Sequence, residues 1–417
     1  MAPPMTSTAN MDEATKIRAR RFILLTVFIY SVGFGIIMPV LPELIMELEG
    51  VSLSEATSLG AWVGASYAIF QFLLGPMIGN LGDRFGRRPV FLFSLAGFGL
   101  DFLLMGLAPS IIWLFVGRSI AGGLGAIFGP ANAAMADMSS AENRAASFGK
   151  VNAAFGFGFI LGPALGGLIA DYGVRLPFFI AGGLALANCL YGYFAFPETM
   201  PQESRRAFDA KRANPFGALA SLGKVKGVLP IALIYFFWLC ATNVYPASWS
   251  FFAPAQYGWD SKMVGISLTV VGVSIALFQT FVIGRAVKRF GERVTATIGI
   301  VSGGLLFLAF AFVTNGTAAL FLIIFNGLSG MAMPAINAMM SMRIPPDQQG
   351  ELQGLNGSLA ALSFLVAQLL FNTVLAYFTR PGGSVNFPGA TFLIASAIAF
   401  IALIALLNLA RRQPVDA

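Results

Sequence analysis

Twelve long apolar stretches constrain this chain more than any other feature of its sequence. Each holds about 20 mostly apolar residues, the length that an α-helix needs to cross a bilayer. Their approximate ranges are 22–42, 58–80, 90–108, 111–136, 146–170, 176–196, 227–253, 263–284, 295–313, 317–341, 353–378 and 389–410. Because lipid offers the backbone no hydrogen bonds, we expect an all-α membrane protein with twelve transmembrane helices.

Composition excludes the common soluble classes. Of the 417 residues, 57% are hydrophobic and only 11% are charged, whereas soluble domains are about 25% charged. The chain has no histidine, and its two cysteines, Cys189 and Cys240, lie in apolar stretches. Histidine zinc sites, histidine-based catalytic triads and a disulfide framework are thereby excluded. We expect no metal, no cofactor and no enzymatic activity.

Basic residues fall almost entirely on one side of this topology. With the N-terminus in the cytoplasm, 22 of the 26 Lys and Arg residues lie in cytoplasmic segments, and only Arg175, Lys262 and Arg380 lie in outer loops. Positively charged segments are retained in the cytoplasm during insertion. The split predicts a multi-pass protein of the inner (cytoplasmic) membrane with both termini cytoplasmic. It also accounts for the net charge of +7 without a nucleic-acid partner.

Two halves of the chain repeat at an offset of 205 residues. Arg84-Phe85-Gly86 recurs as Arg289-Phe290-Gly291, and Asn132-Ala133 recurs as Asn337-Ala338. Repeated halves are how secondary transporters build a site near the membrane midplane. We therefore expect two pseudo-symmetric six-helix bundles, and the predicted divisions are a cytoplasmic tail at 1–21, a bundle at 22–196, a polar linker at 197–226, a bundle at 227–410 and a cytoplasmic tail at 411–417.

Two charged residues lie deep inside predicted spans. Asp101 follows the inner start of the third span by twelve residues, and Arg118 follows the outer start of the fourth by eight. At 1.5 Å per residue, both lie about 18 Å from the inner face. Because a short turn joins the two spans, the residues can meet. They form either a neutralised structural pair or a proton-coupling site in which Asp101 changes protonation and Arg118 tunes it.

The loop after the second span, GNLGDRFGRRP at 79–89, is predicted to be a cytoplasmic gate. Its glycines permit close turns, Asp83 can accept backbone N–H groups at a helix start, and its arginines can bind acidic groups. A basic loop that only fixes topology is the alternative, but it does not account for the acid and the ordered glycines. The gate candidates are Gly79, Asp83, Arg84, Gly86, Arg87 and Arg88, with Arg289 and Arg293 in the repeated loop.

The fifth span carries small residues at helical spacing: Gly158, Gly162, Pro163, Gly166 and Gly167. Small residues four positions apart allow two helices to approach closely, and proline bends a helix. We expect a tight helix contact there, either as ordinary packing or as a seal against leakage.

Polar and aromatic residues inside the spans are candidates to line a substrate cavity. For each of them, packing between helices is the alternative interpretation. The candidates are Tyr30, Phe34, Gln71, Asn132, Asn152, Phe155, Trp238, Asn243, Phe278, Gln279, Asn337 and Asn356.

These motifs resemble those of the major facilitator superfamily over nearly the whole chain. The loop at 79–89 resembles its signature between spans two and three, and the glycine motif of span five resembles that of its antiporter branch. Within that branch, segments such as GIIMPVLP at 35–42 and LDFLL at 100–104 are similar to the tetracycline efflux proteins. The resemblance implies proton-driven export of a drug, in which Asp101 and Arg118 stand at functional positions. It further implies that Gln71 and Gln279 line the path, that Asp83 latches the inner gate, and that Asp137 pairs with the loop arginines.

The chain departs from the tetracycline pattern at three titratable positions. Tyr30, Ile275 and Gly303 stand where that family has an acid, a histidine and an acid, respectively. Proton coupling would therefore rest mainly on Asp101, and tetracycline itself is not required as a substrate.

The sequence thus predicts a monomeric secondary active transporter that exports a small hydrophobic or amphipathic compound, drug-like or metabolite, by alternating access as a proton antiporter. Its expected partners are that substrate, protons and the lipid bilayer. Two alternatives stay open: a facilitator or exchanger that is not coupled to protons, and a membrane receptor or scaffold that transports nothing.

Overall fold

A computed structural model describes residues 11–125, 127–139, 143–208, 214, 228–344 and 349–412. Within these ranges every regular element is a helix. Eleven helical segments are long and apolar enough to cross a membrane, and a pair bent by 40° (316–323 with 326–341) makes a twelfth if it is counted as one span. The predicted all-α membrane fold is confirmed.

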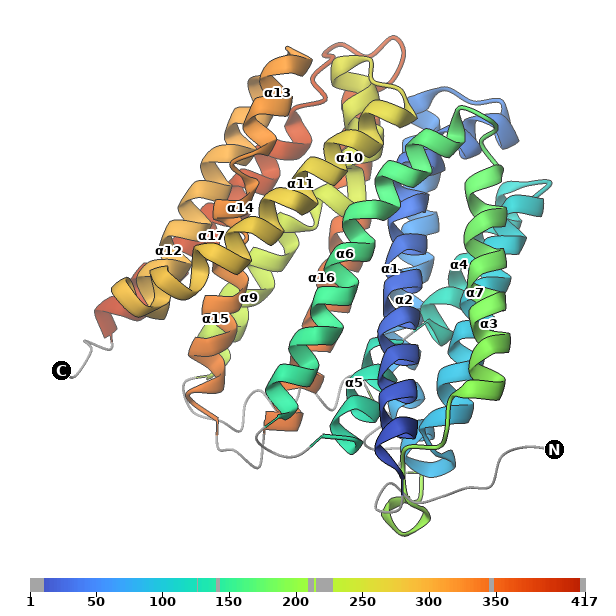
Figure 1. Ribbon diagram of the computed structural model, residues 1–417. Helices are drawn as coiled ribbons and strands as arrows, with labels where there is room; N and C mark the ends of the chain where they lie inside the picture. The colour runs from blue at the N-terminus through green and yellow to red at the C-terminus, as the bar shows by residue number, and fades with distance from the viewer. Residues whose placement is uncertain are drawn as a thin grey trace. The chain divides into compact units, whose positions relative to one another are not determined.

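The chain runs through these helices in order (Figure 1). Their bounds are α1 Glu13–Glu49, α2 Leu53–Phe85, α3 Arg87–Leu107, α4 Ile111–Leu124, α5 Phe128–Asp137, α6 Arg144–Ala170, α7 Leu176–Ala195, the 3-10 turn η2 Gln202–Ser204, α9 Val228–Thr242, α10 Val244–Tyr257, α11 Ser261–Phe281, α12 Ile283–Phe312, α13 Gly316–Ile323, α14 Asn326–Ser329, α15 Ala332–Ser341, α16 Gln349–Thr379 and α17 Ala390–Arg412.

Equivalent spans of the two halves break at equivalent places. The fourth span divides into α4, which ends at Leu124, and α5. The tenth divides into α13, α14 and α15, and the end of α14 at Ser329 lies at the offset of 205 residues that relates the sequence repeats. Its other break, after Ile323, has no counterpart between α4 and α5. Glycines crowd both breaks, at Gly125 and Gly330 among others, and glycine weakens a helix interior.

The repeated loops also share a backbone turn. Gly86 has a φ of 100° and Gly291, its partner in the repeat, has a φ of 76°. Side chains of L-residues rarely adopt such angles, so glycine is needed in both loops. At Gly86 the turn ends α2 and starts α3; at Gly291 it lies within the bounds of α12 and separates the end of the eighth span from the ninth.

The helices cluster into two compact units. Unit 1 comprises Met1–Glu49 with Ser66–Pro215, and unit 2 comprises Gly50–Ala65 with Phe216–Ala417. The first residues of α2 thus pack inside unit 2, where Ser54 Oγ donates to the Ala376 carbonyl at 2.8 Å. The N-terminal bundle predicted from the sequence included residues 50–65. The other predicted domain boundaries stay predictions.

Within unit 1, α1 packs along α6 through the small residues of the fifth span (Figure 1). A Cβ atom added at Gly158, Gly162 or Gly166 would lie 2.5–2.6 Å from a carbonyl oxygen of α1. Pro163 approaches Gly35 of α1 equally closely, and Gly167 is buried. The glycines are therefore needed for the backbones to meet.

Two acidic residues at the C-terminal end of α1 bind neighbouring loops of unit 1. Glu47 pairs with Arg175 at 3.0 Å, and the same arginine donates to the carbonyls of Gly106 and Ala108. Glu49 accepts the first backbone N–H of α4, from Ile111, at 2.8 Å. These contacts fix the turn that joins α3 to α4, and with it the relative height of those two helices.

The helix contact of the fifth span generates a matched prediction. Gly162→Ala places a methyl group against the Val32 carbonyl, and we expect it to lower the stability of the purified protein by about 1–3 kcal/mol. Gly156→Ala, on the same helix with open space around it, should raise stability by about 0.5–1 kcal/mol because alanine favours helix. Thermal unfolding in detergent measures both; equal effects of the two variants would contradict the assigned contact.

Candidate functional site

The two charged residues predicted to meet inside the membrane do so. Asp101 on α3 and Arg118 on α4 form an ion pair in which the guanidinium Nε donates to Oδ1 at 3.1 Å and Nη2 faces Oδ2. Asp101 is fully buried, and Arg118 is 6% exposed. Gly117 makes room for the carboxylate, because a Cβ atom there would lie 2.8 Å from Oδ1. A hydrogen bond in which both groups are charged is stronger than one between neutral groups.

Aromatic rings surround the cation of this pair. The guanidinium carbon of Arg118 lies 5.7 Å from the ring centre of Tyr67 on α2 and 5.9 Å from that of Phe102 on α3. Tyr30 on α1 stacks on Phe98, with ring centres 4.5 Å apart. Such rings stabilise a desolvated cation through their electron-rich faces.

A short hydrogen-bonded chain joins this buried group to a partly exposed amide. The hydroxyl groups of Tyr30 and Tyr67 lie 3.1 Å apart, and Gln71 Nε2 donates to the Tyr67 hydroxyl at 3.3 Å. Tyr30 and Gln71 were predicted as cavity residues, whereas Tyr67 was missed. Its signal in the sequence was its position one helical turn before Gln71, which puts both on one face of α2.

Other predicted cavity residues of unit 1 lie along a file of aromatic rings. Phe34 is 6.4 Å from both Tyr67 and Phe159, and Phe159 stacks on Phe155 at 6.0 Å. Phe155 meets Phe128 at 4.8 Å. Asn132 lies one turn beyond Phe128 on α5, and its Oδ1 has no hydrogen-bond partner within the described ranges. Asn152 is exposed.

The predicted cavity residues of unit 2 form separate contacts. Asn356 donates to Asn337 at 2.7 Å, and Asn243 donates to Ser363 at 3.1 Å. Trp238 is 1% exposed. Its ring packs against Gly303, where an added Cβ atom would lie only 2.6 Å from it. A Cβ atom on Gly327 would lie 2.2 Å from the ring of Phe278, and Gln279 is exposed.

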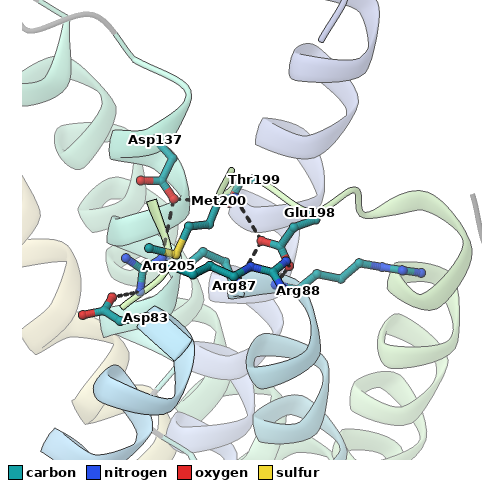
Figure 2. A network of polar contacts seen from close by, with 8 residues as sticks. All are labelled: Asp83, Arg87, Arg88, Asp137, Glu198, Thr199, Met200 and Arg205. Atoms are coloured by element: carbon teal, nitrogen blue, oxygen red, sulfur yellow. Dashed lines mark hydrogen bonds and ion pairs between the residues drawn. The ribbon is translucent and has the colours of Figure 1, made fainter. Parts of the chain in front are cut away.

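A second polar network lies at the predicted gate loop (Figure 2). Arg87, the first residue of α3, pairs with Asp83 at 2.7 Å and reaches Asp137 at the end of α5 at 3.5 Å. Thr199 donates to the same Asp137 oxygen at 3.5 Å. The structure therefore joins the loop acid, the loop arginine and the acid of the fourth span into one network.

Glu198 completes this network, although sequence reasoning missed it. Its Oε1 accepts the backbone N–H of Arg87 at 2.8 Å, and its Oε2 accepts that of Arg88 at 3.3 Å (Figure 2). A carboxylate at a helix N-terminus satisfies free N–H groups and complements the helix dipole. A Cβ atom on Gly86 would lie 2.2 Å from Oε2, so glycine also leaves the space that Glu198 fills.

The first residues of the predicted linker are thereby fastened to the gate loop. Arg205 Nη2 lies 3.9 Å from Glu198 Oε2, and the Arg206 backbone N–H donates to the Asp83 carbonyl at 3.0 Å. The sequence signal was the position of Glu198 directly after the sixth span. Residues 209–213 and 215–227 of the predicted linker lie outside the described residues.

The side chains of the remaining gate candidates make no contact with the network among the described residues. Arg84 lies over the ring of its neighbour Phe85, and Arg88 lies over Tyr193 and donates to its carbonyl. In the repeated loop, Arg289 lies over Phe290. Gly79 has open space around it, and Arg293 follows the Gly291 turn.

Among the residues that the structure describes, no three carboxylate or thiol groups gather into a set that could hold a metal ion. The chemistry that this arrangement offers is proton binding at a buried carboxylate and hydrogen bonding at amides and phenols.

Comparison with known proteins agrees with this architecture. Residues 23–255 and 231–417 match the Major Facilitator Superfamily. The chain is 35% identical to the class C tetracycline resistance protein of Escherichia coli, over 92% of this chain and 95% of that protein. It is 28% identical to multidrug resistance protein 2 of Bacillus subtilis, over 82% of this chain and 84% of that protein.

Solved structures show the same fold. A bacterial homologue of the human lysosomal transporter Spinster, in an inward-facing and unoccupied conformation, has a TM-score of 0.79 at 16% identity and covers 96% of this chain and 98% of that one. The human organic anion transporter MFSD10 has a TM-score of 0.70 at 20% identity, with 94% and 99% covered. With its repeated six-span halves, its gate loop and these relatives, the chain belongs to the Major Facilitator Superfamily of membrane transporters, within the group related to tetracycline and multidrug resistance proteins, and is not an enzyme.

Proposed function

We propose that this protein exports a small hydrophobic or amphipathic compound by alternating access in exchange for protons. The observation that carries the proposal is the fully buried Asp101, held by Arg118 between two membrane-spanning helices of unit 1. A charge in that position is costly, and such groups mark ion or proton pathways in transporters.

The pair supplies a change of charge when a proton binds. With Asp101 ionised, the carboxylate and the guanidinium sum to zero. With Asp101 protonated, the site carries the uncompensated charge of Arg118, because this cation keeps its proton at all ordinary pH values. A site whose net charge depends on one proton favours different arrangements of its helices in the two states, which is the requirement for coupling.

The side chains near the pair support an apolar substrate. The partly exposed rings of Phe34, Phe159 and Phe155 offer an aromatic surface, and Gln71 offers a hydrogen-bonding amide. The related proteins are named for resistance to tetracycline and to multiple drugs, and a drug or an amphipathic metabolite fits this surface.

The network of Asp83, Arg87, Asp137 and Glu198 is proposed to latch the cytoplasmic gate. It ties the end of α2, the start of α3, the end of α5 and the start of the linker together. Movement of any of these elements must break at least one charged contact, so the network favours one conformation over another.

The charge split between loops supports an orientation with both termini in the cytoplasm and a location in the inner membrane. The protein is proposed to act as a monomer, with the substrate, protons and lipid as its partners.

An uncoupled facilitator is the alternative that one observation favours. Because Arg118 balances Asp101 and both are buried, the pair would also serve as a purely structural link between α3 and α4. A receptor or scaffold without flux is the remaining alternative.

Asp101→Asn separates these functions. The assay uses proteoliposomes loaded with tetracycline, the fluorescent cation ethidium or a fluorescent lipid-like amphiphile. We expect a pH gradient to drive flux in the wild type and about 100-fold less flux in Asp101→Asn, the size of effect seen when a proton-transfer group is removed.

Glu55→Gln is the matched control, because Glu55 is exposed near the start of α2 and its hydrogen bond to Ser52 survives in the amide. Flux that ignores both the gradient and Asp101→Asn contradicts coupling and establishes the facilitator. A wild type that moves none of the compounds favours the receptor.

Glu198→Ala tests the latch. The variant leaves the Arg87 and Arg88 N–H groups without their acceptor, so we expect the free energy of unfolding to fall by about 1–3 kcal/mol. Transport should slow at the same time, because the gate loses its preferred conformation. Glu203→Ala, which is exposed on η2, is the control and should change neither quantity. A variant that is less stable but transports at the wild-type rate would show that Glu198 caps α3 without gating.

A further inference from the structure

We propose that Tyr67 is the positioning residue that links the partly exposed Gln71 to the buried pair of Asp101 and Arg118. Its ring faces the guanidinium of Arg118, and its hydroxyl group is bonded to both Gln71 and Tyr30. The inference rests on the proposed proton antiport, because it assigns the route by which the substrate and the proton sense one another.

The ring of Tyr67 has a role that depends on the protonation of Asp101. While Asp101 is ionised, its two oxygens neutralise Arg118. When Asp101 takes up a proton, the guanidinium loses its counter-charge in a buried environment. The faces of Tyr67 and Phe102, both within 6 Å of the guanidinium carbon, then carry its stabilisation.

No other acid on the neighbouring spans replaces this role. The apolar stretch 22–42 of α1 and the whole of α7 contain no charged residue. On α2 the acids are Glu55, at the outer end, and Asp83, at the gate loop. Lys150 is the one charged residue between positions 146 and 170 of α6, and it lies near the start of that helix. The rings that lie beside the guanidinium are those of Tyr67 and Phe102, and Tyr30 reaches them through its hydrogen bond to Tyr67.

The hydroxyl of Tyr67 extends this site to the substrate side. Gln71 Nε2 donates to it, and Gln71 is only partly buried. A substrate that hydrogen-bonds the Gln71 amide competes for that bond and changes the set of groups that hold the phenol of Tyr67. The backbone of Tyr67 packs tightly against α4, because a Cβ atom added to Gly122 would lie only 2.2 Å from the Tyr67 carbonyl oxygen. We therefore expect substrate binding at Gln71 to move the side chain of Tyr67, next to Arg118, rather than its backbone.

A double-mutant cycle tests the ring without any substrate. Tyr67→Leu is combined with Asp101→Asn in the full-length protein, and apparent melting temperatures are measured in detergent. In Asp101→Asn the guanidinium has no counter-charge, so Tyr67→Leu should lower the melting temperature by about 2–4 °C more than it does in the wild-type background. Tyr245→Leu, in the aromatic core of unit 2, is the control and should be additive with Asp101→Asn. Additivity for Tyr67→Leu as well would overturn the proposed contact.

Transport by Tyr67→Phe tests the hydroxyl group. Proteoliposomes are assayed with tetracycline and ethidium in two ways, by exchange of labelled for unlabelled probe and by accumulation driven by a pH gradient. We expect exchange within about twofold of the wild type and gradient-driven accumulation lower by about tenfold, the size of a typical coupling between two sites. Tyr245→Phe, whose hydroxyl has no hydrogen-bond partner among the described residues, should leave both unchanged.

The outcomes separate this inference from the proposed function. A coupling role for Tyr67 is overturned if exchange and accumulation fall together in Tyr67→Phe, or if both stay unchanged. The proposed proton antiport stands in either case. A wild type that exchanges the probes but ignores the gradient overturns the antiport and the coupling role together. A wild type that moves neither probe overturns the antiport and the coupling role for these compounds. The double-mutant cycle of melting temperatures then still decides whether the ring of Tyr67 stabilises the guanidinium of Arg118.

Discussion

The cost of holding one carboxylate inside a membrane shapes much of unit 1. Asp101 is tolerated because Arg118 forms an ion pair with it and donates a hydrogen bond to Oδ1, and that requires α3 and α4 to be held at fixed relative height. The turn between α3 and α4 is held by contacts with Glu47, Glu49 and Arg175. Gly117 supplies the space for the carboxylate, and Tyr67 supplies an aromatic face to the cation. Local choices on four helices thus serve a single ion pair.

The two halves share backbone geometry but not chemistry. Both loops turn at a glycine with positive φ, and both fourth spans break at the same place in the repeat. At the offset of 205 residues, however, Leu306 stands for Asp101, Ile323 for Arg118 and Lys288 for Asp83. Unit 2 replaces the ion pairs with amide and hydroxyl contacts and with an aromatic core around Trp249 and Phe392. The residues proposed for proton coupling and for the latch therefore all lie in unit 1.

The sequence predicted those parts of the site that depend on position along a helix. The spans follow from composition, because lipid leaves a chain few alternatives to helices. The meeting of Asp101 and Arg118 follows from a rise of 1.5 Å per residue on two helices joined by a short turn. Tyr67 and Glu198 could not be predicted in this way. Tyr67 depends on how α2 is rotated toward Arg118, and Glu198 caps a helix that starts 111 residues earlier in the chain. Helical spacing places Tyr67 on the same face of α2 as Gln71, and Glu198 follows the sixth span directly, but neither position identifies the contact partner.

The replacement of an acid by Tyr30 bears on the energetics of the proposed antiport. A phenol bonded to Tyr67 carries no charge at ordinary pH, so the buried site exchanges a single proton, the one on Asp101. Export of a neutral compound against that proton moves one net charge across the membrane, whereas export of a monovalent cation moves none. The membrane potential contributes about 2.3 kcal/mol per charge for each 100 mV. A neutral substrate therefore draws on both the pH gradient and the potential, and a cationic substrate draws on the pH gradient alone.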